Sequence, residues 1–179
     1  AVAMTWENGP RTYRQVEQRA NQIAHALRSA GVQRGDIVGI FLDRGPDLVC
    51  ALMGILKSGA AFMALDPKTP GEVLTRIFAG VDCKLVLSRR TLSSRIPETS
   101  ARLLFFDEPA WLNSQPLSRP VPIADPNDPA CVLFTSGSSG RPKAVLYLHR
   151  NLAVRFANIV QVSGFDQFSV FSQSSPVTS

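Results

Sequence analysis

The chain has 179 residues, of which 45% are hydrophobic and 18% are charged, an ordinary composition for a globular protein with a sizeable core. Its net charge is +5, but the basic residues are scattered in runs no longer than Arg89-Arg90, which argues against a nucleic-acid partner and favours small anionic ligands. The longest apolar run, residues 48–56, is too short to span a bilayer, so no membrane partner is expected.

The three cysteines, Cys50, Cys83 and Cys131, are far apart in apolar surroundings, with neither C-x-x-C spacing nor a histidine nearby. This pattern predicts buried, reduced thiols in a cytoplasmic protein and no metal site. The first ten residues lack a charged segment followed by an apolar one, so no signal peptide is expected.

The chain opens with a turn signal, Asn8-Gly9, between two short β-type runs, which predicts a hairpin. A helix follows, begun by a capping box of Thr12 and Gln15 and closed by Gly31. Its apolar residues recur at helical spacing: Val16, Ala20, Ile23, Ala24 and Leu27. His25 lies about half a turn from this stripe, so we expect it to be solvated and not a ligand.

Strands and helices then alternate. Residues 37–42 are nearly all apolar, which is typical of a buried strand, and Gly45-Pro46-Asp47 begins a second helix. Gly54 within this helix permits close packing, at a cost of about 1 kcal/mol in helix propensity. The expected apolar stripe is Leu48, Leu52, Ile55 and Leu56, ended by Gly59. The further expected elements are a strand at 61–65, a helix at 70–80, and strands at 84–88 and 103–106.

This alternation predicts an α/β fold with a mainly parallel, Rossmann-like sheet and helices on both faces. Ligands of such sheets bind beyond the carboxyl ends of the strands. Asp66 directly follows one predicted strand, but Asp-Pro also opens turns, so we interpret it as structural. Residues 107–130 hold six of the thirteen prolines and predict an extended connection without a helix, anchored by Trp111.

The most informative stretch is Cys131 to Leu148, in which two apolar runs predict strands on either side of a polar loop. The loop residues are Thr135, Ser136, Gly137, Ser138, Ser139 and Gly140. Two glycines let the backbone adopt positive φ, so that N–H groups can point into one anion-binding concavity. Lys143 adds a mobile positive charge, the usual partner of phosphate. We therefore predict that this loop binds a polyphosphate.

Other interpretations of the loop remain open. It matches neither common nucleotide fingerprint, because Lys143 does not directly follow a glycine and no G-x-G-x-x-G occurs. Ser/Gly loops often serve only as hairpin connections, although this one is long and ends in Pro-Lys. Hydrolysis by a serine nucleophile is disfavoured, because the G-x-S-x-G spacing is missing and the base would have to be His25 or His149.

A last helix is predicted after the second strand, with Asn151 as its N-cap. Its apolar positions are Leu152, Phe156, Ile159 and Val160. His149, between strand and helix, could orient a phosphate, but we do not assign it to the site. Residues 169–171 predict the start of one more strand.

The segment TSGSSGRPKA, residues 135–144, resembles the phosphate-binding signature of the adenylate-forming superfamily of acyl-CoA synthetases, luciferases and nonribosomal peptide synthetase adenylation domains. Residues 11–27 and 56–72 resemble the first and second conserved blocks of the peptide synthetase branch, and the third block extends to Leu152. The departures are Ala144 for a usual glycine, Ser139 for threonine, and Met63-Ala64 for Val-Pro. None of them removes a phosphate-binding group.

This resemblance implies that residues 1–179 are one partial domain, the N-terminal portion of an adenylation domain in a larger chain. The parent would be an AMP-forming ligase that uses ATP and Mg²⁺ to activate a carboxylic acid, in this branch an amino acid. The acyl-adenylate would pass to the thiol of a carrier domain or of CoA. Residues 135–140 and Lys143 would bind the phosphates, with the catalytic residues and the magnesium ligand beyond Ser179. The alternatives are a non-catalytic nucleotide-binding or degraded fragment, and a standalone acyl-CoA ligase.

Overall fold

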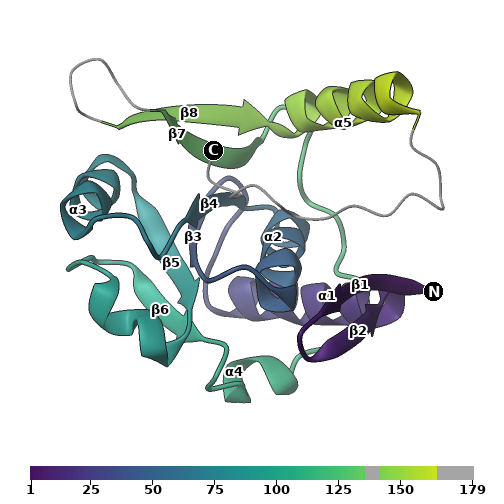
Figure 1. Cartoon of the computed structure of the whole chain (residues 1–179), viewed down its shortest axis with the longest axis horizontal. Helices are drawn as coiled ribbons and strands as arrows, with labels where there is room; N and C mark the ends of the chain where they lie inside the picture. Colours follow the sequence, from purple (N-terminus) through teal and green to yellow (C-terminus); the bar gives the residue numbers. More distant parts are fainter. Residues whose placement is uncertain (136–141, 165–179) are drawn as a thin grey trace.

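The computed structural model describes residues 1–135 and 142–164, which form two sheets and flanking helices (Figure 1). A two-stranded antiparallel sheet pairs β1 with β2, and the main sheet has the strand order β6-β5-β3-β4-β7-β8. The strands are β1 (Val2–Trp6), β2 (Gly9–Thr12), β3 (Ile37–Phe41), β4 (Ala61–Leu65), β5 (Cys83–Ser88), β6 (Arg102–Phe105), β7 (Pro129–Thr135) and β8 (Lys143–Leu148). The helices are α1 (Tyr13–Ser29), α2 (Pro46–Ser58), α3 (Gly71–Gly80), the 3₁₀ helix η1 (Arg90–Arg95), α4 (Ala110–Asn113) and α5 (His149–Ser163).

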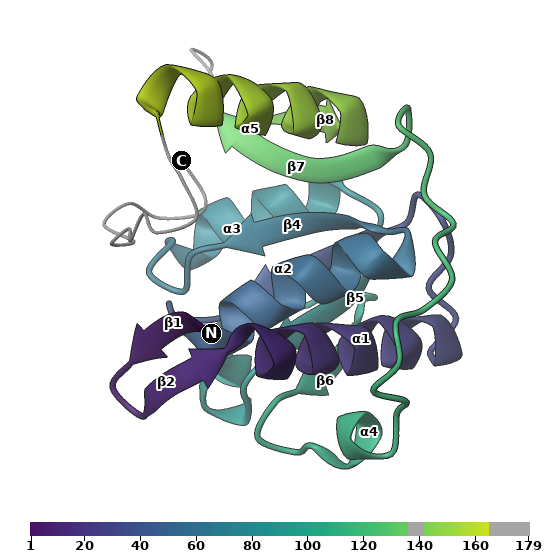
Figure 2. The same cartoon turned by 90° about the vertical axis from the view of Figure 1, so that its right-hand side faces the viewer.

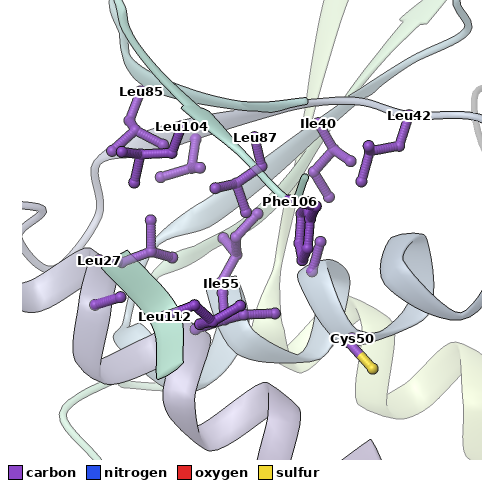
Figure 3. Packing of buried hydrophobic residues seen from close by; sticks show 14 of the residues in the cluster. Leu27, Ile40, Leu42, Cys50, Ile55, Leu85, Leu87, Leu104, Phe106 and Leu112 are labelled. Carbon is purple, nitrogen blue, oxygen red and sulfur yellow. The ribbon is translucent and has the colours of Figure 1, made fainter. Parts of the chain in front are cut away.

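The main sheet is parallel except for β8, which runs antiparallel to β7. Helices α1 and α2 cover one face, where Leu27, Ile55 and Leu87 belong to one hydrophobic cluster (Figure 3). Helix α3 covers the other face, where Leu74 and Ile77 pack with strand residues in a second cluster. The predicted fold class is therefore confirmed.

Local signals explain where α1 and α2 begin and end. The Thr12 hydroxyl accepts a hydrogen bond from the Gln15 N–H at 3.3 Å, and the Gln15 side chain accepts one from the Thr12 N–H at 2.8 Å. Gly31 follows α1 with φ +91°, and Gly59 caps α2 with φ +90°, a conformation that side chains with a Cβ disfavour. The predicted capping box and both glycine stops are confirmed.

The two helices approach closely at Gly54, as predicted. A Cβ built on Gly54 would lie 2.6 Å from Cβ of Ile23 and 3.0 Å from the carbonyl oxygen of Ala20. The buried stripe of α2 is rotated from the predicted one, because this contact draws the Gly54 side of the helix inward. Ala51 and Ile55 are fully buried, whereas Leu52 is only half-buried.

The polar face of α1 binds the extended connection between β6 and β7 (Figure 2). Side chains of α1 donate hydrogen bonds to carbonyl oxygens of this connection: Asn21 donates to Leu117 (2.8 Å), Gln22 to Gln115 (3.3 Å) and Arg28 to Val121 (2.9 Å). A ring nitrogen of His25 lies 3.0 Å from the carbonyl oxygen of Ser118. The expectation that His25 is solvated was therefore wrong in part, since the connection half-covers it. These bonds satisfy backbone groups that an extended segment cannot pair within itself.

The expectation that residues 107–130 lack a helix was wrong by one turn, because α4 forms at residues 110–113. The anchor is the predicted one. The Trp111 indole N–H donates a hydrogen bond to the carbonyl oxygen of Phe105 at 2.8 Å. The indole ring packs edge-to-face against the Phe106 ring, with their centroids 5.8 Å apart. This anchoring holds the turn against the end of β6.

Helix α5 leaves its apolar side chains uncovered by the rest of the described chain. None of its residues is buried, and Phe156 and Val162 are 63% and 86% exposed. Asn151 was predicted as the N-cap, but Leu148 occupies that position and Asn151 is the third residue of the helix. The Asn151 side chain accepts a hydrogen bond from the Leu148 N–H at 3.0 Å. Apolar faces of this kind mark contact surfaces or aggregation sites.

We expect the isolated chain of residues 1–179 to self-associate through α5. Replacing Phe156 and Val160 with serine should shift its sedimentation toward the monomer, because these changes remove exposed apolar area from one helix face. The same substitutions at the exposed Leu117 and Val121 of the connection are the matched control and should leave association unchanged. A wild-type chain that is already monomeric would contradict the prediction.

Candidate phosphate-binding site

The predicted phosphate loop joins β7 to β8 at the carboxyl edge of the sheet. Because β7 is parallel to β4, Thr135 at the end of β7 lies at the edge where β3, β4 and β5 also end (Figure 1). Thr135 and Lys143 are directly opposite each other in the β7–β8 ladder. The other predicted loop residues, Ser136, Gly137, Ser138, Ser139 and Gly140, lie outside the described residues.

Lys143 is exposed at this edge, and none of the ion pairs found among residues 1–135 and 142–164 involves it. Its ammonium group is therefore available to an anion at the mouth of the loop, next to the hydroxyl-bearing Thr135. Both side chains come from paired strands, which hold a site more rigidly than a free loop does.

Neither histidine joins this site. His149 follows β8 at the end opposite to Lys143, about 20 Å away at the usual rise of an extended strand. Its backbone N–H donates to the carbonyl oxygen of Asp128 at 3.1 Å, and its buried Nε2 has no partner among the described residues. This position agrees with leaving His149 out of the predicted site. A serine hydrolase also gains no support, since His25 faces the connection instead.

Asp66 forms the turn after β4. Its side chain accepts a hydrogen bond from the Lys68 N–H at 2.8 Å, and its carbonyl oxygen accepts one from the Thr69 N–H at 2.9 Å. These bonds close an Asx turn, which agrees with the structural interpretation of Asp66.

The three cysteines are buried and free, as predicted. Burial raises the pKa of Cys50 and of Cys83 to about 11, so both thiols stay protonated near neutral pH. In the part of the chain that the structure describes, no three His, Cys, Asp or Glu side chains gather closely enough to hold a metal ion. No helix there is both long and apolar enough to cross a membrane.

An ion pair at the base of the β7–β8 hairpin was not predicted from the sequence. Arg34 donates two hydrogen bonds to the carboxylate of Asp128, at 2.6 and 2.8 Å, and the Asp125 N–H donates a third at 2.6 Å. The Arg34 bonds, followed by the backbone bond from Asp125, lower the pKa of Asp128. Because the partners are 94 residues apart, no local pattern could indicate the pair.

The Asp128 carboxylate should make stability depend on pH. Its pKa is lower in the folded than in the unfolded chain, so its contribution is complete above the unfolded carboxyl pKa and is lost as pH falls through the folded value. We expect Asp128→Asn to lower the urea midpoint at neutral pH and to match the wild type at strongly acidic pH. Asp82→Asn, at an exposed surface pair with Lys84, is the matched control and should have little effect at any pH. A constant difference across pH would contradict this assignment.

The fold and the sequence together define a class of protein, an α/β domain with a Ser/Gly-rich sequence between two strands, Thr135 and Lys143 standing at the carboxyl edge of its sheet. Comparison with known families narrows the class, because residues 1–177 match the family model described as "AMP-binding enzyme". The chain therefore belongs to the AMP-binding enzyme family.

The chain is also similar to individual peptide synthetases. It is 33% identical to gramicidin S synthase 2 of Brevibacillus brevis over 168 residues, which are 93% of this chain and 4% of that protein. It is 37% identical to tyrocidine synthase 3 of Brevibacillus parabrevis over 158 residues, 87% of this chain and 2% of that one. The chain thus spans only a small part of the length of these relatives.

Among solved structures, the chain is similar to the nonribosomal peptide synthetase FmoA3. The AMPPNP-bound form matches with a TM-score of 0.81 and 27% identity, covering 92% of this chain and 17% of that one. The form bound to α-methyl-L-serine-AMP matches with a TM-score of 0.80 and 26% identity, covering 90% and 18%. The likeness extends over nearly all of the chain and supports the assignment to the N-terminal part of an adenylation domain.

Proposed function

We propose that the protein to which this chain belongs activates an amino acid with Mg-ATP. The products are an aminoacyl-adenylate and pyrophosphate, and the aminoacyl group is later transferred to the thiol of a carrier domain. Residues 1–179 form one partial domain of this enzyme and contribute its phosphate loop. The catalytic groups and the acid-binding pocket belong to other parts of the protein.

The observation that carries this proposal is the position of Thr135 opposite Lys143 at the carboxyl edge of the sheet. A lysine that has no ionic partner among the described residues, together with a hydroxyl group, suits the charge of a nucleotide's phosphates. Family membership supplies the nucleotide, and the FmoA3 structures with AMPPNP and an aminoacyl-adenylate support the reaction. The amino-acid substrate rests on this similarity to peptide synthetases.

In this proposal the loop orients the β- and γ-phosphates and stabilises the charge that develops on departing pyrophosphate. Lys143 supplies the positive charge, and the hydroxyl groups and backbone N–H groups of the loop supply hydrogen bonds. The roles of Ser136, Gly137, Ser138, Ser139 and Gly140 stay predictions. Mg²⁺ would offset the negative charge of the phosphates, and we expect its protein ligands outside residues 1–179.

Acid-dependent ATP–pyrophosphate exchange tests the reaction on the native full-length protein. A panel of amino, aryl and fatty acids should give exchange with one or a few amino acids and background rates with the others. Exchange with fatty or aryl acids alone, followed by formation of a CoA thioester, would identify an acyl-CoA ligase instead. ATP binding without exchange for any acid would favour the non-catalytic nucleotide-binding module.

A further inference from the structure

A cleft opens at the carboxyl edge of the sheet, beyond the ends of β3 and β4. It has a volume of about 500 Å³, which lies in the usual range for small-molecule sites. Its walls come from three places in the chain, namely the turn of the β1–β2 hairpin, the segment from β3 into α2, and the segment after β4. Figure 2 shows the hairpin on the same side of the molecule as the carboxyl ends of β4 and β7.

The strand order explains why a cleft forms there. β3 lies between β4 and β5, and the chain leaves β3 through α2 on one face of the sheet and leaves β4 through α3 on the other. The two connections therefore diverge, and a crevice opens between the ends of β3 and β4. Crevices at such a switch of connection are where open α/β sheets bind ligands.

The floor of the cleft is apolar and its rim is charged. Leu42, Leu48, Ala64 and Leu65 contribute buried floor positions. Arg44 and Lys68 stand at the rim, and neither side chain forms an ion pair among the described residues. Because neither cation is paired with a carboxylate among the described residues, both are available to an anionic ligand.

Trp6 provides an aromatic wall. Its side chain is 37% exposed, and its Nε1 lies 3.6 Å from the position that a Cβ on Gly45 would occupy. The indole therefore lies close to the start of α2, at one side of the cleft. A ring held in this way offers a stacking surface to a planar base, a contact worth about 1–3 kcal/mol in nucleic-acid complexes.

The charges at the rim restrict the ligand. Glu7, Asp43 and Asp66 also line the cleft, so its two cations do not match the high negative charge of a triphosphate. A phosphate monoester carries at most two negative charges, which Arg44 and Lys68 match. The carboxylates can accept hydrogen bonds from ribose hydroxyls, as acidic residues do in dinucleotide sites. The combination of aromatic ring, two cations and carboxylates suits a nucleoside monophosphate better than ATP.

We propose that this cleft, whose described lining includes neither Thr135 nor Lys143, is a second nucleotide site that binds AMP. The base stacks against Trp6, the phosphate binds Arg44 and Lys68, and the apolar floor receives the sugar edge. The proposal stands independently of the adenylation reaction, because it rests only on the lining of the cleft.

The test uses an azido-adenine derivative of AMP as a photoprobe on the native full-length protein, followed by tryptic peptide mapping. We expect a label on the peptide that ends at Arg11 and contains Trp6, which free AMP prevents more effectively than ATP does. The double variant Arg44→Ser, Lys68→Ser should weaken this protection by roughly tenfold or more, as expected for losing charge-assisted hydrogen bonds.

Two further variants test whether the label depends on the charges of this cleft in particular. Lys84→Ser with Arg95→Ser removes the same charge from other exposed positions and should leave the label unchanged. Lys143→Ala should also leave it unchanged, because the phosphate loop is a different site. Absence of an AMP-protectable label on the Trp6 peptide would overturn the proposal. So would a label that is lost in Lys143→Ala or that persists at full affinity in the Arg44, Lys68 double variant.

Discussion

Replacing Lys143 with alanine should lower the rate of amino-acid-dependent ATP–pyrophosphate exchange by roughly 100-fold, which corresponds to about 3 kcal/mol of transition-state stabilisation. The side chain is exposed and lies opposite Thr135 at the mouth of the loop, without an acidic partner among the described residues. Its loss removes a positive charge where negative charge would develop on pyrophosphate. The effect should therefore appear mainly in the rate of exchange at saturating ATP.

The control for this variant is Lys84→Ala. Lys84 lies on β5 and forms an exposed ion pair with Asp82, just before that strand. The exchange rate of this control should equal that of the wild type, and both variants should keep the wild-type thermal stability. An unchanged exchange rate in Lys143→Ala would remove the loop from the proposed mechanism. A loss of exchange together with a loss of stability would show that Lys143 acts on the fold.

The second large effect is expected at Gly54, where α1 and α2 meet. A methyl group there would lie 2.6 Å from the branched Cβ of Ile23, next to the Ala20 carbonyl oxygen, and neither atom can move without its helix. We expect Gly54→Ala to destabilise the α1–α2 pair by about 1–3 kcal/mol, in spite of alanine's better helix propensity. Amide hydrogen exchange of α1 and α2 peptides in the full-length protein should accelerate accordingly.

Gly80→Ala provides the matched control. Gly80 is also a helical glycine, at the end of α3, but a Cβ on it would meet nothing within 4 Å. The main effect of this change is then the higher helix propensity of alanine, so the free energy of unfolding should stay the same or rise slightly. Equal effects of the two substitutions would show that close packing at Gly54 does not limit stability.

Much of the architecture could be predicted from local sequence signals. Each of these signals depends only on neighbouring residues, so the sequence predicts the element that it begins or ends. The signals are the capping box at Thr12, the glycine stops at Gly31 and Gly59, and the apolar runs of β3 and β4. The position of the phosphate loop was predictable for the same reason. A loop that follows a parallel strand must lie at the carboxyl edge.

Features that depend on distant residues were not predictable. The bonds from the α1 side chains to residues 115–121 join positions more than 90 apart in the chain, and they explain why His25 is half-covered. Periodicity places a residue on a helix face, but it does not tell what packs there. His149 was expected near the loop because it is near in sequence, yet an extended strand carries it to the opposite end of the hairpin.

The sequence by itself determined the α/β class and the family, because the signals for both lie in contiguous residues, and the same kind of signal predicts the phosphate loop. Only the tertiary structure decided that Thr135 faces Lys143, that Arg34 pairs with Asp128, and that the apolar face of α5 stays open within the described chain. It also decided that a cleft lined by Trp6 and Arg44 opens beside β4. The physical reason is that strand order and helix packing join groups whose separation along the chain carries no local signal.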